Sequence, residues 1–257
     1  MNIYVLLKRT FDTEEKITLS NGRINEDSAE FIINPYDEYA VEEAIQVRDR
    51  EGGEVTVISV GGEEVEKELR TALAMGADKA VLINIEDDIE DGDQYTTAKV
   101  LTEYLKNKEV DLIIGGNVTV DGGSGQVGPR VAEMLDIPYI TTITKLEIDG
   151  RKVTIVRDVE GDSETIEASL PILVTAQQGL NEPRYPSLPG IMKAKKKPFD
   201  KVDLEDLELD EDDVEAKVQT VEIFLPPKKE AGKVLSGELN EQVSGLVQLL
   251  RNEAKVI

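Results

Sequence analysis

Short apolar runs alternate with amphipathic segments through the first half of the chain, and this alternation restricts the possible folds more than any other feature. Four mostly apolar runs have the length of buried strands, at residues 3–7, 54–60, 79–84 and 110–116. The segments after them predict helices that begin at Asn34-Pro35 and then span residues 63–75, 95–106 and 126–135. Such alternation is typical of a parallel sheet with right-handed crossovers and helices on both faces. We therefore predict a doubly wound α/β fold with a mostly parallel sheet.

The pattern changes after Pro138. Four segments there have the composition of antiparallel strands, at residues 139–148, 152–159, 164–170 and 172–175. The Asp149-Gly150 pair between the first two is a strong hairpin signal. We expect these strands to be added along one edge of the same domain.

The residues after Pro198 differ in character from the α/β pattern before them. Residues 200–215 are strongly acidic, and we expect them to be loosely structured. Residues 239–252 repeat apolar positions at helical spacing, which predicts an amphipathic helix that packs either on a partner or back on its own domain. We divide the chain into an α/β domain at residues 1–198, which includes a docking loop at 181–198, and a C-terminal arm at 199–257.

The composition limits the available chemistry. The chain has no cysteine, histidine or tryptophan, which excludes thiol nucleophiles, disulfides, iron–sulfur ligation and histidine metal sites. A formal net charge of −24 disfavours nucleic-acid binding, which needs a basic face. No apolar run approaches the length of a membrane span, so we expect a cytoplasmic protein that is not embedded in a membrane. A cofactor holder or binding subunit without catalytic residues of its own is favoured over a self-contained enzyme.

A glycine-rich loop lies between the fourth predicted strand and the fourth predicted helix. Residues 121–128 read Asp-Gly-Gly-Ser-Gly-Gln-Val-Gly. Glycines let backbone amides approach phosphate oxygens, and a helix N-terminus adds partial positive charge. The loop is not a P-loop, because no lysine follows, and it lies too late in the sheet for a dinucleotide fingerprint. On residue chemistry alone, a phosphate-binding loop and a merely tight turn are both open.

The segment at residues 181–198 combines prolines, apolar residues and lysines. Prolines at positions 183, 186 and 189 rule out a continuous helix or an interior strand. Apolar side chains at positions 188, 191 and 192 stand beside a basic run at 193–197 in an otherwise acidic chain. This combination favours a docking surface for another protein over an ordinary loop packed on its own domain.

Several segments resemble the electron transfer flavoprotein small (beta) subunit family. Residues 180–185 read Leu-Asn-Glu-Pro-Arg-Tyr and residues 191–197 read Ile-Met-Lys-Ala-Lys-Lys-Lys, as in the family signature. Asn34-Pro35, residues 70–78 and residues 121–128 match the same family in the same order. The resemblance spans nearly the whole chain and is weakest at the C-terminal end. It implies a sheet of the adenine nucleotide alpha hydrolase type.

The resemblance assigns a nucleotide to the glycine loop. In most family members this loop binds the phosphate of a tightly held AMP, and in a bifurcating subset that uses NADH it holds a second FAD. The matching positions here are Leu6, Asn34, Asp37, Val60, Asp121, Gly122, Gly123, Ser124, Gly125, Gln126, Val127 and Gly128. Asn34 and Asp37 also fit an ordinary helix cap. Because Val127-Gly128-Pro129 also occurs in some bifurcating members, AMP and FAD both stay open.

The resemblance also implies a flavin-proximal pair and a docking set. Arg157 and Asp158 match residues close to an FAD that is held mainly by the large subunit, although some relatives have glutamate at the second position. Leu188 matches a leucine that anchors in a pocket of the dehydrogenase. The full docking set is Tyr185, Leu188, Pro189, Ile191, Met192, Lys193 and Lys196.

The implied function is electron transport in fatty acid beta-oxidation. As the small half of a heterodimer, the chain would accept electrons from acyl-CoA dehydrogenases and other flavoenzymes and pass them toward a membrane quinone oxidoreductase. Its arm at 199–257 would wrap the large (alpha) subunit. Two other functions are open: a nucleotide-sensing binding protein of the same fold, and an independent hydrolase on a related fold. The lack of histidine, cysteine and a lysine-bearing phosphate loop counts against the hydrolase.

Overall fold

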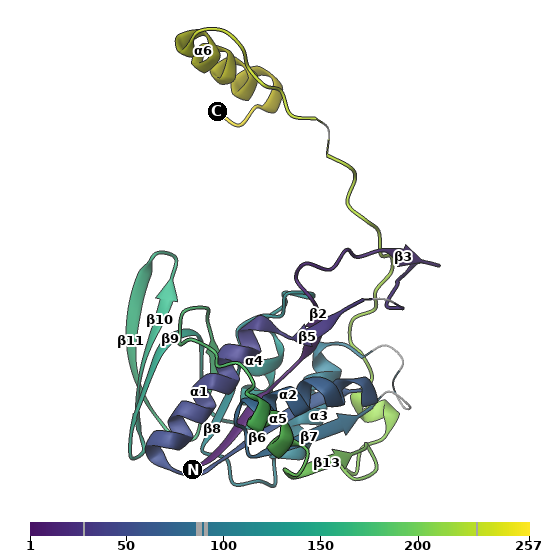
Figure 1. Cartoon of the computed structure of the whole chain (residues 1–257), viewed down its shortest axis with the longest axis vertical. Coiled ribbons are helices and arrows are strands. Elements are labelled where there is room, and N and C mark those ends of the chain that lie inside the picture. Colours follow the sequence, from purple (N-terminus) through teal and green to yellow (C-terminus); the bar gives the residue numbers. More distant parts are fainter. Residues whose placement is uncertain (28, 86–88, 90–91, 230) are drawn as a thin grey trace. The chain divides into compact units, whose positions relative to one another are not determined.

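A nine-stranded sheet forms the centre of Met1–Glu222 in the computed structural model, which describes all residues except 28, 86–88, 90, 91 and 230 (Figure 1). The strand order is β11-β10-β9-β12-β8-β1-β6-β7-β13. The strands are β1 (Asn2–Leu6), β6 (Glu54–Gly61), β7 (Lys79–Asn84), β8 (Leu112–Gly116), β9 (Tyr139–Asp149), β10 (Lys152–Val159), β11 (Asp162–Ser169), β12 (Ile172–Ala176) and β13 (Phe199–Val202). The predicted α/β fold with a mostly parallel sheet is confirmed.

All neighbouring strands from β9 to β13 pair in parallel, and only β10 and β11 add antiparallel pairs. The prediction of an antiparallel strand at residues 172–175 is therefore wrong. β12 lies inside the sheet, parallel to both β8 and β9. Every residue of β12 is buried, as expected for an interior strand covered on both faces.

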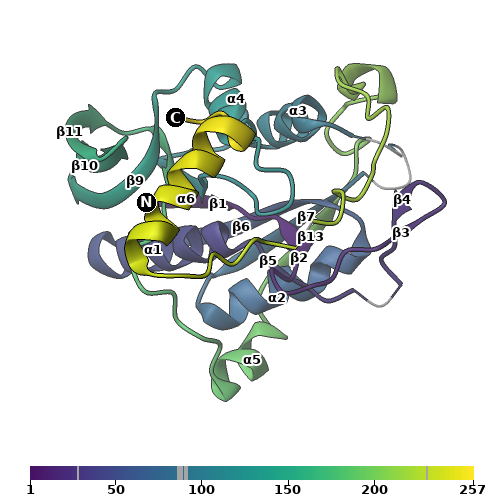
Figure 2. The same cartoon turned by 90° about the horizontal axis from the view of Figure 1, so that it is seen from above.

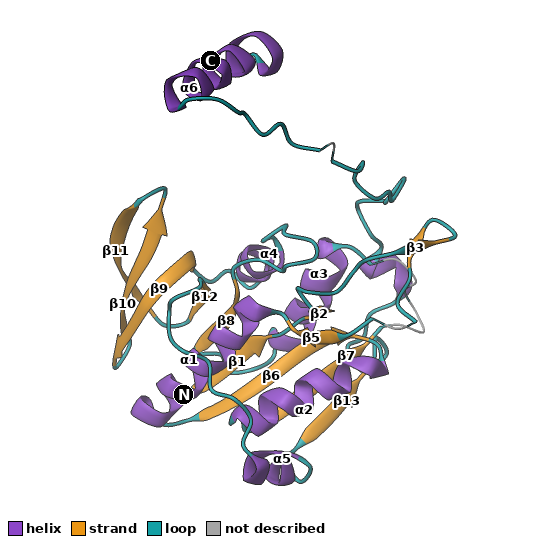
Figure 3. Ribbon diagram, turned by 45° about the horizontal axis from the view of Figure 1, so that its top comes forward, coloured by secondary structure: helices purple, strands orange, loops and turns teal. Residues whose placement is uncertain are grey.

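Helices cover both faces of the sheet (Figures 2 and 3). The described helices of this unit are α1 (Pro35–Glu51), α2 (Glu66–Met75), α3 (Gln94–Leu105), α4 (Val127–Met134) and α5 (Leu188–Ala194), with 3₁₀ turns at Glu63–Val65 and Glu211–Val214. Leu112 and Ile114 of β8 pack in the cluster of α1 and α2, whereas Ile113 between them packs in the cluster of α3 and α4. This alternation follows from the two-residue period of a strand.

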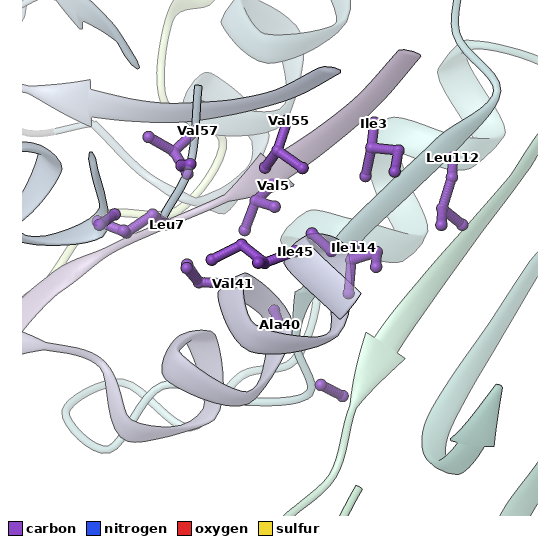
Figure 4. Close-up of a cluster of buried hydrophobic side chains, with 14 of the residues drawn as sticks. Ile3, Val5, Leu7, Ala40, Val41, Ile45, Val55, Val57, Leu112 and Ile114 are labelled. Atoms are coloured by element: carbon purple, nitrogen blue, oxygen red, sulfur yellow. The ribbon is translucent and has the colours of Figure 1, made fainter. Parts of the chain in front are cut away.

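Aliphatic side chains dominate the buried core between α1 and the sheet (Figure 4). Val41 and Ile45 of α1 face Val5 of β1 and Ile114 of β8, and each of these residues is fully buried. Burying one such side chain stabilises a fold by roughly 1.5–3 kcal/mol. This packing holds the strand ends that carry the candidate site at fixed positions.

Two short ladders follow the carboxyl end of β1. β2 (Arg9–Phe11) pairs with β5 (Phe31–Ile33), and β3 (Leu19–Ser20) pairs with β4 (Arg23–Ile24). Lys8 N–H lies between β1 and β2 and is held by the Asp37 carboxylate of α1 at 2.7 Å. The segment between β1 and α1 therefore leaves the main sheet at its carboxyl edge and returns beside the same edge.

The acidic segment after Pro198 is ordered, contrary to the sequence prediction. β13 pairs with β7, and the side chains of Leu204 and Val214 are buried against α3 and the sheet. The Thr96 hydroxyl donates to the Val214 carbonyl at 2.7 Å. Sparse apolar anchors hold this segment while its carboxylates face outward. The segment therefore belongs to the compact unit Met1–Glu222.

The second unit, Ile223–Ile257, contains the predicted amphipathic helix. It is α6 (Leu239–Leu249), extended by a π-helical turn at Leu250–Ala254. None of the residues of α6 is buried. Among the described residues, no helix has both the length and the apolar character that crossing a membrane requires.

Candidate functional site

A cavity of about 270 Å³ opens at the carboxyl ends of β1, β6 and β8. Ligands sit at this edge in open parallel sheets. Nine predicted nucleotide residues line it, namely Leu6, Asp37, Val60, Gly122, Ser124, Gly125, Gln126, Val127 and Gly128. Three further predicted residues, Asn34, Asp121 and Gly123, are not part of its wall. The structure thus brings β1, β6 and the glycine loop to one hollow, as the sequence predicted.

The glycine loop needs glycine for conformational reasons. Gly123 and Gly125 have φ of +63° and +61°, in the left-handed region that side chains disfavour. A Cβ at Gly125 would also lie 3.1 Å from the Asn117 carbonyl oxygen. A Cβ at Gly128 would lie 3.2 Å from the Thr175 methyl group. Glycine at these positions therefore lets the backbone of the loop lie close to the cavity.

Two helices begin at the cavity, and their first turns differ. Asp93 caps α3, because its carboxylate accepts from the N–H groups of Tyr95 and Thr96 at 2.9 Å each. The N-cap residue of α4, Gln126, makes no such side-chain cap. Instead its Oε1 accepts from the Arg130 guanidinium at 2.9 Å. The N–H groups of Val127 and Gly128 at the start of α4 thus have no side-chain cap and can meet an anionic group, with the partial positive charge of a helix N-terminus behind them, whereas Pro129 has no N–H to offer.

Asn34 does not cap α1 with its side chain, so the capping interpretation is wrong for this residue. Its Nδ2 donates to the Val118 carbonyl at 2.9 Å and to Asp37 at 3.0 Å, while its Oδ1 accepts from Val120 N–H at 3.2 Å. Asn34 is fully buried. Its role is to fasten the start of the glycine loop to α1, which explains why an amide side chain is needed there.

Asp37 connects three segments around the cavity. Its carboxylate accepts from Lys8 N–H at 2.7 Å, from Gly116 N–H at 2.9 Å and from Asn34 Nδ2 at 3.0 Å. Burial raises the pKa of Asp37 to about 7, although these hydrogen bonds and the Lys8 charge oppose the rise. The carboxyl group thus holds the ends of β1 and β8 together, at an energetic cost once it is ionised.

This raised pKa predicts a pH-dependent stability. Because the folded-state pKa lies above the ordinary aspartate value of 3.8, the folded protein binds the proton more tightly than the unfolded chain between these two pH values. The stability of the wild type relative to Asp37→Asn should fall by roughly 3 kcal/mol between about pH 5 and pH 8. Urea unfolding of both proteins across this range measures it, and a constant difference would contradict the assignment.

Lys8 and Asp121 form an ion pair beside the cavity. The Lys8 Nζ lies 2.6 Å from Asp121 Oδ2, and Lys8 is the basic residue in the described wall of the cavity. Burial raises the pKa of Asp121, but hydrogen bonds from Lys8, Thr119 and Gly122 outweigh it and leave the pKa below its usual value. Asp121 therefore stays ionised and places the Lys8 charge next to the glycine loop.

Arg157 and Asp158 lie at the end of β10, as predicted, and do not line the cavity. Arg157 Nη2 pairs with Glu164 of β11 at 2.8 Å. Asp158 is exposed, and its carbonyl oxygen lies 3.3 Å from the Thr142 hydroxyl of β9. The structure therefore separates this pair from the glycine loop and places it on the antiparallel extension of the sheet.

Specific polar anchors fasten the docking loop to α1 and α2. Asn181 Nδ2 donates to Glu43 at 3.1 Å, and Arg184 Nε donates to Glu42 at 2.7 Å. Lys197 donates to the Leu73 carbonyl in α2 at 3.0 Å and to the Ala77 carbonyl just after α2 at 2.6 Å. The first and last parts of the signature thus fix the ends of the loop, and Lys197 is an internal anchor rather than a surface charge.

Part of the docking loop, Leu188–Ala194, forms a short helix that was not predicted from the sequence. The Ser187 side chain accepts from Gly190 N–H at 3.1 Å and caps α5. Pro189 lies in the first turn, where no helical N–H partner is lost. A Cβ at Gly190 would lie 2.5 Å from the Ala74 carbonyl oxygen of α2, so glycine allows close packing there. Pro189 therefore lies at the start of the helix, where proline is tolerated, and does not prevent the helix from forming.

The middle of the docking loop faces outward. Leu188 is 80% exposed and Met192 is 73% exposed, which is unusual for large apolar side chains. All the predicted docking residues are exposed: Tyr185, Leu188, Pro189, Ile191, Met192, Lys193 and Lys196. The loop is therefore an anchored platform with free apolar side chains.

Several residues of the cavity wall are not among the nucleotide residues predicted from the sequence, although the loops at residues 7–9 and 115–128 were expected at this edge of the sheet. These include Lys8, Asp93, Thr97, Asn117, Thr119 and Thr175. Lys8 and Asn117 directly follow the ends of β1 and β8, so their position at the carboxyl edge was a usable signal. Thr175 could not be found in this way, because β12 had been placed at the wrong position in the sheet.

Comparison of the sequence with known proteins identifies the family of this chain. The family model described as "Electron transfer flavoprotein domain" matches residues 21–207. The chain is 68% identical to the electron transfer flavoprotein subunit beta of Bacillus subtilis, with 100% of both chains covered. This chain belongs to the electron transfer flavoprotein beta subunit family. It is also 40% identical to the beta subunit of Thermoanaerobacterium thermosaccharolyticum over 98% of both chains, and 39% identical to that of Syntrophomonas wolfei over 100% of this chain and 98% of the relative.

Family membership identifies the chain as the beta subunit of an electron-transfer flavoprotein, whose partner is an alpha subunit. The electron carrier activity belongs to that flavoprotein.

Proposed function

We propose that the chain holds one AMP in the cavity and offers the docking loop to acyl-CoA dehydrogenases and other flavoenzymes, within a heterodimer that delivers electrons to a membrane quinone oxidoreductase. The observation that carries the proposal is the cavity at the carboxyl edge of the sheet, closed by a glycine loop at the free N-terminus of α4. The match of these residues to the family's nucleotide positions supports the same conclusion.

The chemistry of the wall fits a nucleoside monophosphate. Apolar side chains of Leu6, Ile58, Val60 and Leu101 provide a surface for a base, whereas the glycine loop and Lys8 provide donors for a phosphate. The volume of about 270 Å³ is just below the usual range for pockets that hold drug-sized ligands. FAD has more than twice as many atoms as AMP, so the volume favours AMP.

The proposal also includes an FAD, which this chain does not hold in its cavity. We place FAD mainly in the alpha subunit, with Arg157 and Asp158 of this chain near it. The chain has no histidine or cysteine for redox or acid–base chemistry of its own, and the flavin supplies the electron chemistry. The chain's contributions are therefore the shape of the complex, the charge near the flavin and partner recognition.

A bifurcating flavoprotein that uses NADH is the second candidate. Val127-Gly128-Pro129, which starts α4, favours it, because the same tripeptide occurs in some bifurcating members. A second FAD in the cavity would then replace AMP. The two candidates differ in the nucleotide that the purified protein releases.

Substitution of Gly125 tests the location of the nucleotide. Gly125→Val should lower AMP content by about tenfold or more, because valine disfavours the left-handed backbone and its Cβ would press on the Asn117 carbonyl. Gly150→Val is the matched control, since Gly150 has φ of +60° with nothing within 4 Å of its Cβ. AMP is released by denaturation and quantified by chromatography. Equal AMP content in both variants would refute this location.

A further inference from the structure

Thr175 stands between the candidate nucleotide cavity and the antiparallel extension of the sheet. It is 1% exposed, lies on β12 and lines the cavity. β12 pairs with β8 on one side and with β9 on the other. Its methyl group also faces Gly128 in the first turn of α4. One buried side chain thus touches the cavity wall, the anion-facing helix and the strand that leads to β10.

The Thr175 hydroxyl links both sides by hydrogen bonds. It donates to Asn117 Oδ1 at 3.1 Å, and Asn117 also lines the cavity. It accepts from the Thr142 backbone N–H of β9 at 3.1 Å. The Thr142 hydroxyl in turn lies 2.7 Å from the Thr141 carbonyl and 3.3 Å from the Asp158 carbonyl of β10. A continuous polar connection therefore runs from Asn117 to the strand that carries Arg157 and Asp158.

β9 is irregular where this connection crosses it. The register with β12 shifts between Val174 and Ala176, and the register with β10 shifts between Val156 and Arg157. Thr142 itself has φ of +59°, which is strained for a β-branched residue. Bulges re-aim the side chains of a strand, and strain of this kind persists only where surrounding contacts hold it. The hydrogen bond from Thr142 to Thr175 is such a contact.

We infer that Thr175 is a positioning residue through which a nucleotide in the cavity sets the conformation of the β9–β10 region that carries Arg157 and Asp158. The inference rests on the proposed nucleotide site. A ligand that orders Asn117 also orients the Thr175 hydroxyl, whose lone pair holds the bulged conformation of Thr142. Such coupling requires an element with two arrangements, and we assign this role to the bulge: left-handed at Thr142 with this bond made, and relaxed without it.

Hydrogen exchange on the complete heterodimer tests the coupling. The complex with the alpha subunit is stripped of nucleotide, and amide exchange is measured for residues 139–159 with and without saturating AMP. In the wild type, AMP should slow exchange in this region. In Thr175→Val, which preserves shape but removes the hydroxyl, the protection of residues 139–159 should be lost when it is measured at AMP concentrations that saturate the variant's own site. Thr175→Ser restores the hydroxyl and should recover the protection.

A second variant keeps the test decisive if Thr175→Val does not fold. Thr142→Gly removes the backbone strain and leaves the cavity wall unchanged, and it should also lose the AMP-dependent protection at residues 152–159. If AMP slows exchange in Thr175→Val or in Thr142→Gly as much as it does in the wild type, the coupling is refuted. The proposed nucleotide site is then unaffected. Failure of the wild-type complex to bind AMP at all would overturn the nucleotide site and the coupling with it.

Discussion

Replacing Leu246 with glutamate should abolish stable association with the alpha subunit. Leu246 lies on the apolar side of α6 together with Leu239 and Val243, and none of these side chains is buried in this chain. An amphipathic helix gains most of its stability from packing of its apolar face, so α6 needs a surface to cover it. A charge placed in such an interface costs several kcal/mol when it is left unpaired.

The matched control for this substitution is Gln248→Glu. It adds the same charge to α6, but on the opposite side of the helix, and should leave association unchanged. Both variants are co-expressed with the alpha subunit and analysed by size-exclusion chromatography. A normal heterodimer in Leu246→Glu would show that α6 is not part of the subunit interface.

Leu188→Ala should slow electron transfer from a reduced acyl-CoA dehydrogenase by weakening the encounter. The side chain is 80% exposed on a loop whose ends are fixed, so its loss removes contact area without disturbing the core. Truncating a buried anchor typically costs 1–3 kcal/mol, which corresponds to about 5–150-fold weaker binding. Rapid-mixing kinetics at low dehydrogenase concentration measure the second-order rate constant.

Leu188→Met is the control, because it conserves volume and apolar character and should retain most of the rate. Flavin content and thermal unfolding of both variants should equal those of the wild type. Because Lys193 and Lys196 are exposed beside the anchor, the wild-type rate should fall as salt is raised. Equal rates for Leu188→Ala and the wild type, at normal flavin content, would exclude the anchor role.

The local elements of the fold were predictable, but the strand order was only partly so. Alternating apolar and amphipathic segments identify β1, β6, β7 and β8 and their helices, because burial on both faces requires those patterns. The sequence of β12 looks the same at an edge or in the interior, and its place between β8 and β9 depends on long-range pairing. The prediction that the acidic segment is loosely structured was wrong for a different reason. A few buried residues, such as Leu204 and Val214, hold this segment in place despite its acidic average composition.

The parts of the candidate site that depend on backbone conformation were predictable from the sequence. The glycine loop needs left-handed φ at Gly123 and Gly125, and glycine at these positions is a direct signal. Side-chain partners were harder to predict. Asn34 looked like a helix cap, yet its amide binds the segment just before the glycine loop, because the fold brings the Val118 carbonyl oxygen within 2.9 Å of its Nδ2. Such contacts between distant segments follow from tertiary structure and leave no local pattern.

Counting the nucleotides carried by the purified protein tests the central claim most directly. The chain expressed alone and its complex with the alpha subunit are denatured, and the released FAD and AMP are quantified against protein. The chain alone should carry no FAD, and the complex should carry one FAD and one AMP per heterodimer. Two FAD molecules without AMP, or FAD bound stoichiometrically to the chain alone, would contradict the proposal that this subunit holds AMP and leaves the flavin mainly to its partner.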